Sequence, residues 1–139
     1  MSEKATLISK DELNNDLLLG VFRQAFMEPH LETDGSIKLM MDGVQIRVSV
    51  EDRGVMRVFA AFGVKPQTTR QQALELCNRI NDELIFIRAC YPAAVQCLWL
   101  DHYIDTNAGI TALEAIDEVR RFRSVIKDIF PKNTEDILA

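Results

Sequence analysis

The chain has 139 residues, and its 16 Lys and Arg against 21 Asp and Glu give a formal net charge of −5 at pH 7. A chain of this length buries about 68% of the surface that it exposes when unfolded, so its core needs neither disulfides nor structural metals. The acidic balance leaves no basic field that could neutralise phosphates, so we expect no nucleic-acid partner and no binding to a membrane surface.

A first helix is expected to begin near Ser9 and to end before Pro29. Ser9 and Glu12 have the spacing of a capping box, in which each side chain accepts a hydrogen bond from the other residue's backbone N–H. The apolar residues that follow recur three and four residues apart, as on one face of a helix; they are Leu13, Leu17, Leu18, Val21, Phe22, Ala25 and Phe26. Helical backbone is disfavoured before a proline, so Pro29 is expected to end this helix.

Three strands are expected next, because apolar and polar residues alternate on both sides of Asp42-Gly43. Asp-Gly is a preferred type I′ turn, and a two-residue turn keeps every apolar residue on one side of the hairpin. Its predicted pairs are Met41–Val44, Leu39–Ile46 and Ile37–Val48. A three-residue loop with Gly54 in the left-handed conformation leads to the third strand. The pairs predicted there are Val50–Met56, Val48–Val58 and Val44–Phe62.

A second helix is expected over Thr69 to Leu84, with a capping box between Thr69 and Gln72. Its apolar stripe is Ala73, Cys77, Ile80 and Leu84, with Leu74 beside it. Two apolar runs, Ile85 to Tyr91 and Val95 to Ile104, predict a second hairpin whose register stays open.

A last helix is expected from the cap at Thr111, with Glu114 three residues later, to Pro131. The resulting order, α-β-β-β-α-β-β-α, predicts a single α+β domain over residues 1–139, in which residues 1–8 and 132–139 are frayed. Strands joined by short turns form an antiparallel sheet, and amphipathic helices are expected to cover mainly one face of it.

The apolar runs are too short and too interrupted to span a bilayer, and the charged amino-terminal segment is unlike a signal peptide. A cytoplasmic location is therefore expected. Cys77, Cys90 and Cys97 have no C-x-x-C spacing, so they predict buried free thiols rather than a disulfide framework or a zinc site. We expect no metal and no cofactor.

Asp101-His102-Tyr103 is the one place where a carboxylate, an imidazole and a phenol adjoin. In a strand, Asp101 and Tyr103 point to one face and His102 to the other, so Asp101 cannot orient His102 as in a catalytic triad. We expect this segment to be a strand end that reaches solvent. A non-catalytic protein is predicted, and an enzyme or small-molecule site near Asp101 and His102 is an alternative.

Both faces of the last predicted strand are apolar, whereas a sheet with helices on one side normally has a polar outer face. Leu98, Leu100 and Ile104 point one way, and Val95, Cys97, Trp99 and Tyr103 point the other. The second face meets either a partner or another segment of this chain. Phe59, opposite Arg47 on the polar face of the first hairpin, favours a partner. The candidate partner-binding residues are Trp99, Tyr103, Cys97, Val95 and Phe59, with Trp99 as the expected anchor.

Three motifs in the second half of the chain carry a family resemblance: the helix end Cys77-Asn78-Arg79-Ile80-Asn81, the strand Leu98-Trp99-Leu100-Asp101, and the run Ala108-Gly109-Ile110-Thr111. The chain resembles the YbjN family of bacterial proteins, described as sensory-transduction regulators, whose fold is similar to that of type III secretion chaperones. The resemblance implies a cytoplasmic, non-catalytic regulatory or chaperone-like protein that binds other polypeptides as a homodimer. A true type III secretion chaperone that binds an effector segment is the alternative.

Overall fold

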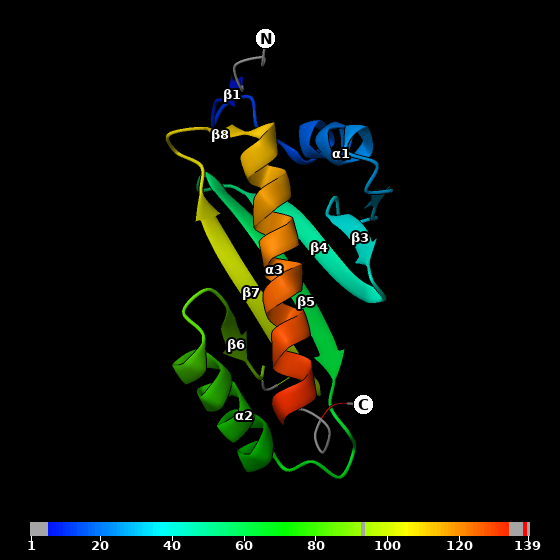
Figure 1. Cartoon of the computed structure of the whole chain (residues 1–139), viewed down its shortest axis with the longest axis vertical. Coiled ribbons are helices and arrows are strands. Elements are labelled where there is room, and N and C mark those ends of the chain that lie inside the picture. Colours follow the sequence, from blue (N-terminus) through cyan, green and yellow to red (C-terminus); the bar gives the residue numbers. More distant parts are fainter. Residues whose placement is uncertain (1–5, 93, 134–137, 139) are drawn as a thin grey trace. The chain divides into compact units, whose positions relative to one another are not determined.

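The computed structural model describes residues 6–92, 94–133 and 138 (Figure 1). Its elements, in chain order, are β1 (Leu7–Ile8), α1 (Asn15–Gln24), β2 (His30–Leu31), β3 (Ile37–Met41), β4 (Val44–Glu51), β5 (Val55–Gly63), α2 (Arg70–Glu83), β6 (Arg88–Cys90), β7 (Cys97–Asp105), β8 (Ile110–Thr111) and α3 (Ala112–Asn133). One sheet has six strands in the order β2-β3-β4-β5-β7-β6, and β1 and β8 form a second sheet. The predicted α+β class with an antiparallel sheet is confirmed.

Two compact units make up the structure, and their boundaries fall inside β5, β7 and α3. The first unit comprises Met1–Val58 and Tyr103–Arg121, and the second comprises Phe59–His102 and Phe122–Ala139. The organisation of residues 1–139 as a single domain stays a prediction.

In the first unit, α1 begins six residues later than predicted. Ser9 and Glu12 do make the reciprocal bonds: Glu12 N–H donates to Ser9 Oγ at 3.3 Å, and Ser9 N–H donates to Glu12 Oε1 at 3.4 Å. These bonds close an isolated turn, because Asn14 then takes extended backbone and starts the helix by accepting from Leu17 N–H at 2.8 Å. The start predicted at Ser9 was therefore wrong, since a second cap follows the first.

The end of α1 is set by Phe26 and not by Pro29, so this boundary was also wrong. Phe26 N–H donates to the Arg23 carbonyl oxygen at 3.1 Å and Met27 N–H to the Phe22 carbonyl oxygen at 3.0 Å, which together form a Schellman motif. Phe26 occupies the left-handed position of this motif, with φ of 60°. Its side chain, expected on the apolar helix face, is 92% exposed.

We expect Phe26→Gly to raise the free energy of unfolding by about 0.5–1 kcal/mol, because glycine adopts the left-handed conformation without the clash of a Cβ. Urea denaturation followed by circular dichroism measures the change. Phe26→Ala, which removes the ring and keeps the Cβ, is the control and should not gain stability. A glycine variant less stable than the alanine variant would contradict this assignment.

The β3–β4 hairpin confirms the register predicted from Asp42-Gly43. The observed pairs are Met41–Val44, Leu39–Ile46 and Ile37–Val48. Asp42 and Gly43 both have positive φ, 51° and 81°, as a type I′ turn requires. Gly54 has the predicted left-handed backbone, with φ of 72°. The pairs predicted between β4 and β5 stay predictions.

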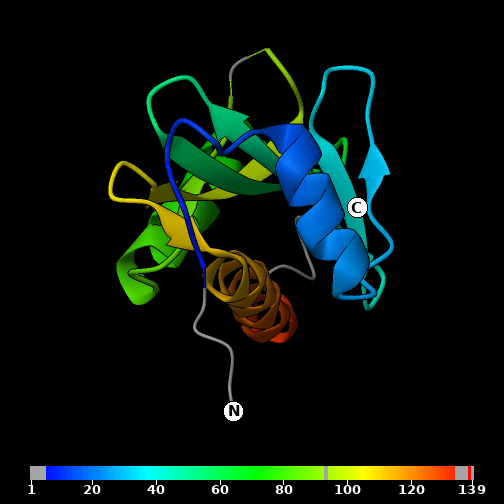
Figure 2. The ribbon, with the colours of Figure 1, turned by 90° about the horizontal axis from the view of Figure 1, so that it is seen from above.

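A short two-stranded sheet at the start of α3 has no counterpart among the predicted elements (Figure 2). Leu7 pairs with Thr111 and Ile8 with Ile110, although residues 1–8 were expected to be frayed. The close approach depends on Gly109, where a Cβ would lie 2.8 Å from Leu7 Cγ. Thr111 caps α3 as predicted, because its Oγ1 accepts from Glu114 N–H at 3.0 Å.

Helix α3 passes the predicted stop at Pro131 and ends at Asn133. A proline removes one backbone hydrogen bond, and in the last turn of a helix that loss leaves the preceding turns intact. Leu138, in the segment expected to be frayed, forms an antiparallel bridge with Val64. The other predicted frayed positions, residues 1–5, 134–137 and 139, lie outside the described residues.

In the second unit, α2 has the predicted capping box. Gln72 N–H donates to Thr69 Oγ1 at 3.1 Å, and Thr69 N–H donates to Gln72 Oε1 at 2.9 Å. The buried stripe is Ala73, Leu76, Cys77 and Ile80, so Leu76 takes the place expected for Leu74, which is 38% exposed.

Helix α2 lies beside β6 (Figure 1), and one asparagine of the helix bonds to the backbone of that strand. Ala89 N–H donates to Asn81 Oδ1 at 2.7 Å, and Asn81 Nδ2 donates to the Ala89 carbonyl oxygen at 3.0 Å. The side-chain amide thus pairs with β6 as the backbone of a neighbouring strand would.

Candidate functional site

Trp99 and Phe59 form an aromatic pair in the second unit. Their ring centroids lie 5.6 Å apart with an interplanar angle of 83°, an edge-to-face arrangement. Trp99 is partly exposed on β7, whereas its strand neighbours Leu98 and Leu100 are buried. Alternation along the strand therefore places Trp99 on the face opposite to these two leucines.

The other candidate partner-binding residues divide between the two units. Cys97 is partly exposed and has the same strand parity as Trp99, and Val95, just before β7, is 40% exposed. Both belong to the second unit, together with Phe59 and Trp99. Tyr103 also shares this parity, but it belongs to the first unit. There the residue is 46% exposed, and its ring centroid lies 5.8 Å from the guanidinium carbon of Arg57.

Asp101 is fully buried, so the expectation of a strand end that reaches solvent was wrong for this residue. Arg88 lies directly opposite on β6 and makes a bidentate pair, with Nε to Oδ1 and Nη2 to Oδ2 both at 2.9 Å. Two parallel charge-assisted bonds satisfy a carboxylate that would otherwise be costly to bury. The Arg88 side chain itself is 62% exposed.

His102 points to the face of β7 opposite to Asp101 and stacks on Phe86, with the ring centroids 3.9 Å apart. Asp101 is therefore paired with Arg88, and His102 packs against Phe86, on opposite faces of the strand. Among the side chains that the structure describes, no group of three or more His, Cys, Asp and Glu is placed to hold a metal ion. Within the same part of the chain, no helix has the length and apolar character to cross a membrane.

The three cysteines are free thiols, and only Cys77 is buried as expected. Cys90 and Cys97 are partly exposed, because their strand positions alternate away from the buried side chains. Burial, and next to it the neighbouring Cys90, raises the pKa of the Cys77 thiol to about 11. A thiol with so high a pKa is almost wholly protonated at neutral pH and is a poor nucleophile.

This pKa predicts a loss of stability at alkaline pH. Between the ordinary thiol value of about 9 and the folded value of about 11, the unfolded chain releases the Cys77 proton and the folded chain keeps it. Below pH 9 both states keep the proton, so the free energy of unfolding does not depend on it. As the pH rises from 9 to 11, the Cys77 thiol lowers the free energy of unfolding by about 2 kcal/mol. Urea denaturation at pH 8 to 11 should show a smaller decline for Cys77→Ala than for the wild type. Parallel declines would contradict the prediction.

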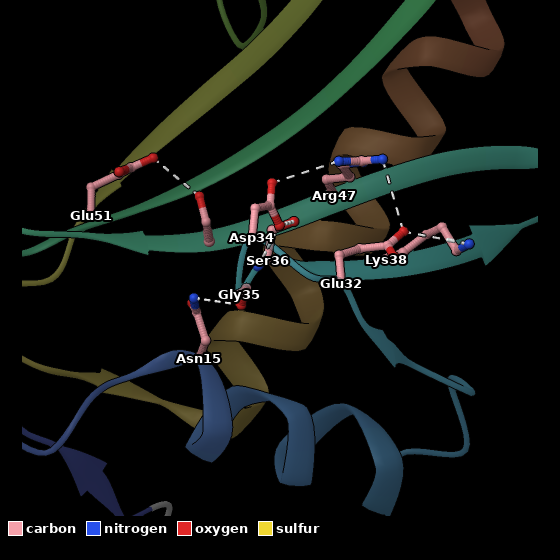
Figure 3. Close-up of polar contacts among 9 residues, drawn as sticks. Asn15, Glu32, Asp34, Gly35, Ser36, Lys38, Arg47 and Glu51 are labelled. Atoms are coloured by element: carbon pink, nitrogen blue, oxygen red, sulfur yellow. Dashed lines mark hydrogen bonds and ion pairs between the residues drawn. The ribbon is translucent and has the colours of Figure 1, made fainter.

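A charged cluster, which was not predicted, surrounds the β2–β3 turn of the first unit (Figure 3). Asp34 Oδ1 accepts from Ser36 Oγ at 2.6 Å and from Ser36 N–H at 2.9 Å, and these bonds lower the pKa of Asp34. Arg47 lies 3.8 Å from both Asp34 and Glu32, and Lys38 lies 3.4 Å from Glu32. Partly exposed ion pairs of this kind contribute little individually, so the cluster mainly orders the turn.

Asn15 ties the start of α1 to the β2–β3 turn and to β4. Its Nδ2 donates to the Gly35 carbonyl oxygen at 2.7 Å, as Figure 3 shows, and its Oδ1 accepts from Val50 N–H at 2.8 Å. The contacts join residues 20 and 35 positions apart in sequence. Sequence patterns give no sign of such a long-range role for one asparagine.

A family model described as "YbjN: Putative bacterial sensory transduction regulator" matches residues 14–134. The chain belongs to the YbjN family. The fold of this YbjN-family chain is similar to a solved structure described as "YbjN, a putative transcription regulator from E. coli", with a TM-score of 0.73 and 19% identity over 89% of this chain and 94% of that one. The resemblance stated from the sequence is confirmed.

Two further solved structures have a similar fold, and both are complexes. A chain of the HopA1–SchA chaperone–effector complex matches with a TM-score of 0.59 and 10% identity, over 81% of this chain and 89% of that one. The type III secretion chaperone SycH of Yersinia pestis, in complex with a stable fragment of YscM2, matches with a TM-score of 0.55 and 11% identity, over 84% and 98% of the two chains. Comparison with curated protein sequences gives no match.

Proposed function

We propose that this YbjN-family protein is a regulatory or chaperone-like module that binds other polypeptides without catalysing a reaction. Family membership and the chaperone-like fold support this proposal. The two similar structures are described as a chaperone–effector complex of HopA1 and SchA and as the chaperone SycH in complex with a YscM2 fragment, so chains of this fold occur in complexes with other polypeptides. A homodimer that works in the cytoplasm is part of the proposal, and a true secretion chaperone for an effector segment is its narrower form.

The observation that carries the proposal is the edge-to-face pair of Phe59 and Trp99. Trp99 keeps part of its surface exposed on the strand face opposite to Leu98 and Leu100. Large aromatic side chains that stay partly exposed are frequent anchors of protein interfaces. We therefore assign partner binding in the second unit to a surface made of Phe59, Trp99, Cys97 and Val95, which we name the Trp99 surface.

The test replaces the anchor with a charge. Trp99→Lys should reduce the capture of polypeptides from the protein's own host about tenfold or more, because an ammonium group cannot be buried in an apolar interface. Ile85→Lys introduces the same charge at a side chain that is fully exposed and lies outside the Trp99 surface. This control should capture the same polypeptides as the wild type, identified by mass spectrometry.

Trp99→Phe keeps an aromatic ring and should retain most of the captured material. Far-UV circular dichroism checks the fold of each variant. Equal losses in Trp99→Lys and Ile85→Lys would contradict the assignment, as would a Trp99→Lys variant that unfolds, because Trp99 would then be a core residue.

A further inference from the structure

The six-stranded sheet ends in β2 at one edge and in β6 at the other. In the second unit, the outer edge of β6 is occupied, because the Asn81 side chain bonds to the backbone N–H and C=O of Ala89. In the first unit, both residues of β2 are exposed. An exposed edge strand presents backbone donors and acceptors with which another strand can pair. The β2 edge is therefore where this sheet can be extended.

The hydrogen bonding of β2 determines which of its backbone groups point outward. Leu31 lies opposite Ile37, and the next residue, Glu32, donates its N–H to the Ser36 carbonyl oxygen at 2.8 Å. Along an antiparallel strand, residues that bond to the neighbouring strand alternate with residues that do not. The N–H and C=O of Leu31 therefore point away from β3. They lie at the outer edge of the sheet, in a residue that is 50% exposed.

Phe26 brings an apolar side chain near this edge. It precedes β2 by four residues, which span at most about 14 Å. Phe26 combines φ of 60° with an exposure of 92%, and both features are unfavourable for a large apolar residue. Strained positions of this kind cluster where they serve a function. An interface at the β2 edge accounts for this position, because a second chain would bury the ring.

The sequence of the edge is complementary to itself. When two copies of β2 pair antiparallel about a two-fold axis at Leu31, His30 of each copy lies opposite Glu32 of the other. An imidazole N–H can donate to a carboxylate in either protonation state. The ion pairs of Glu32 with Lys38 and Arg47 both use Oε1, so Oε2 can accept this bond (Figure 3). The polar groups of the edge therefore suit a second copy of this chain.

We propose that two copies of this chain pair through β2, with the Leu31 N–H of each copy donating to the Leu31 carbonyl oxygen of the other and with Phe26 buried beside the paired strands. This rests on the homodimer that is part of the proposed function. It assigns the dimer contact to the first unit and leaves the Trp99 surface of the second unit to other polypeptides. Short paired strands form a small interface, so we expect a reversible dimer with a dissociation constant on the order of 10 µM.

Sedimentation velocity of the full chain, from about 1 µM to about 300 µM, measures this dimer. In Leu31→Lys, two ammonium groups would face each other across the paired strands, so the dissociation constant should rise about tenfold or more. Leu113→Lys is the matched control, because Leu113 lies on α3 in the same unit, is 59% exposed and gives the same change of net charge. It should change the dissociation constant less than about twofold. Equal weakening in both variants would overturn the proposal.

Leu31→Pro tests the backbone hydrogen bonds. A proline removes one N–H, and at Leu31 that N–H points away from β3. The variant should therefore keep a melting temperature near that of the wild type, while its dissociation constant rises about tenfold or more. Glu32→Pro removes an N–H that bonds to Ser36, and its melting temperature should fall. A melting temperature of Leu31→Pro as low as that of Glu32→Pro would overturn the orientation inferred for Leu31.

Phe26→Gly gives a readout that a purely structural role would not produce. The glycine variant is expected to be more stable than the wild type, as argued above, when unfolding is measured far below the dissociation constant of the dimer. Its dimer should nevertheless be about fivefold weaker, because the apolar ring is lost from the interface. A dimer as tight as that of the wild type would overturn the role of Phe26.

The outcomes separate this interface from the proposed function. A dimer that Leu31→Lys and Leu31→Pro leave unchanged would overturn the interface but not the homodimer. A wild-type chain that stays monomeric at every concentration would overturn both. Capture of polypeptides from the host, which depends on the Trp99 surface, should be unchanged in Leu31→Lys. If this variant instead loses the captured polypeptides, the β2 edge binds a partner chain, and the assignment to a second copy is overturned.

Discussion

Arg88→Ala is expected to lower the free energy of unfolding by about 2–4 kcal/mol, a large effect for a side chain that is 62% exposed. The reason lies in Asp101, which is completely buried and receives two hydrogen bonds from the Arg88 guanidinium. Removing the arginine leaves a buried carboxylate without this compensation. Urea denaturation at pH 7, monitored by circular dichroism, measures the loss.

Two further variants distinguish this mechanism from a simple loss of surface packing. Arg88→Lys keeps the charge but cannot make the planar bidentate contact, so its stability should fall between wild type and Arg88→Ala. Adding Asp101→Asn to Arg88→Ala removes the buried charge and should restore part of the loss. A change below about 0.5 kcal/mol in Arg88→Ala would show that the pair acts as an ordinary surface ion pair.

Asn81→Ala is expected to cost about 2–3 kcal/mol, because Asn81 satisfies both backbone polar groups of Ala89 on β6. The loss follows from leaving a partly buried N–H and C=O without partners. Thermal or urea unfolding of the variant measures it.

Asn78→Ala is the matched control, since Asn78 lies three residues earlier on α2 and is exposed. Alanine has the higher helix propensity, so this control should be neutral or slightly stabilising. Asn81→Asp can still accept from Ala89 N–H but cannot donate to its carbonyl oxygen, and its stability should be intermediate. If Asn81→Ala matched Asn78→Ala, the contact with β6 would not hold α2 in place.

Sequence reasoning succeeded where local chemistry decides the structure. Asp42-Gly43 favours one turn type, and that turn alone sets the β3–β4 register. Thr69 and Gln72 start α2 because an uninterrupted helical segment follows them. Ser9 and Glu12 make the same bonds, yet Asn14 then interrupts the helix, so the predicted boundary was too early. A capping pattern therefore predicts a local turn more securely than it predicts the start of a helix.

Elements that depend on distant partners were missed. Strands β1 and β8 have two residues each, too few for any periodic pattern, and they form by pairing segments about 100 residues apart. The burial of Asp101 depends on Arg88, which lies opposite on β6. This pairing could not be predicted, because the length of the loop between the two strands was uncertain and the loop length sets their register. The two hydrogen bonds of Asn15 likewise join residues that are distant in sequence.

The candidate site was predicted in part. Alternation along the strand predicted that Trp99 and Leu98 lie on opposite faces, and their burial agrees with it. The contact between Phe59 and Trp99 was not predicted as a pair, because it joins strands that are distant in sequence. The role of both residues in partner binding stays a proposal.

Native mass spectrometry of the protein, gently isolated from its own host, tests the central claim most directly, because one spectrum reports subunit number and any retained polypeptide. We expect a homodimer or a complex with another chain. A bare monomer that carries only a small-molecule adduct would contradict the claim that this YbjN-family protein works by binding polypeptides.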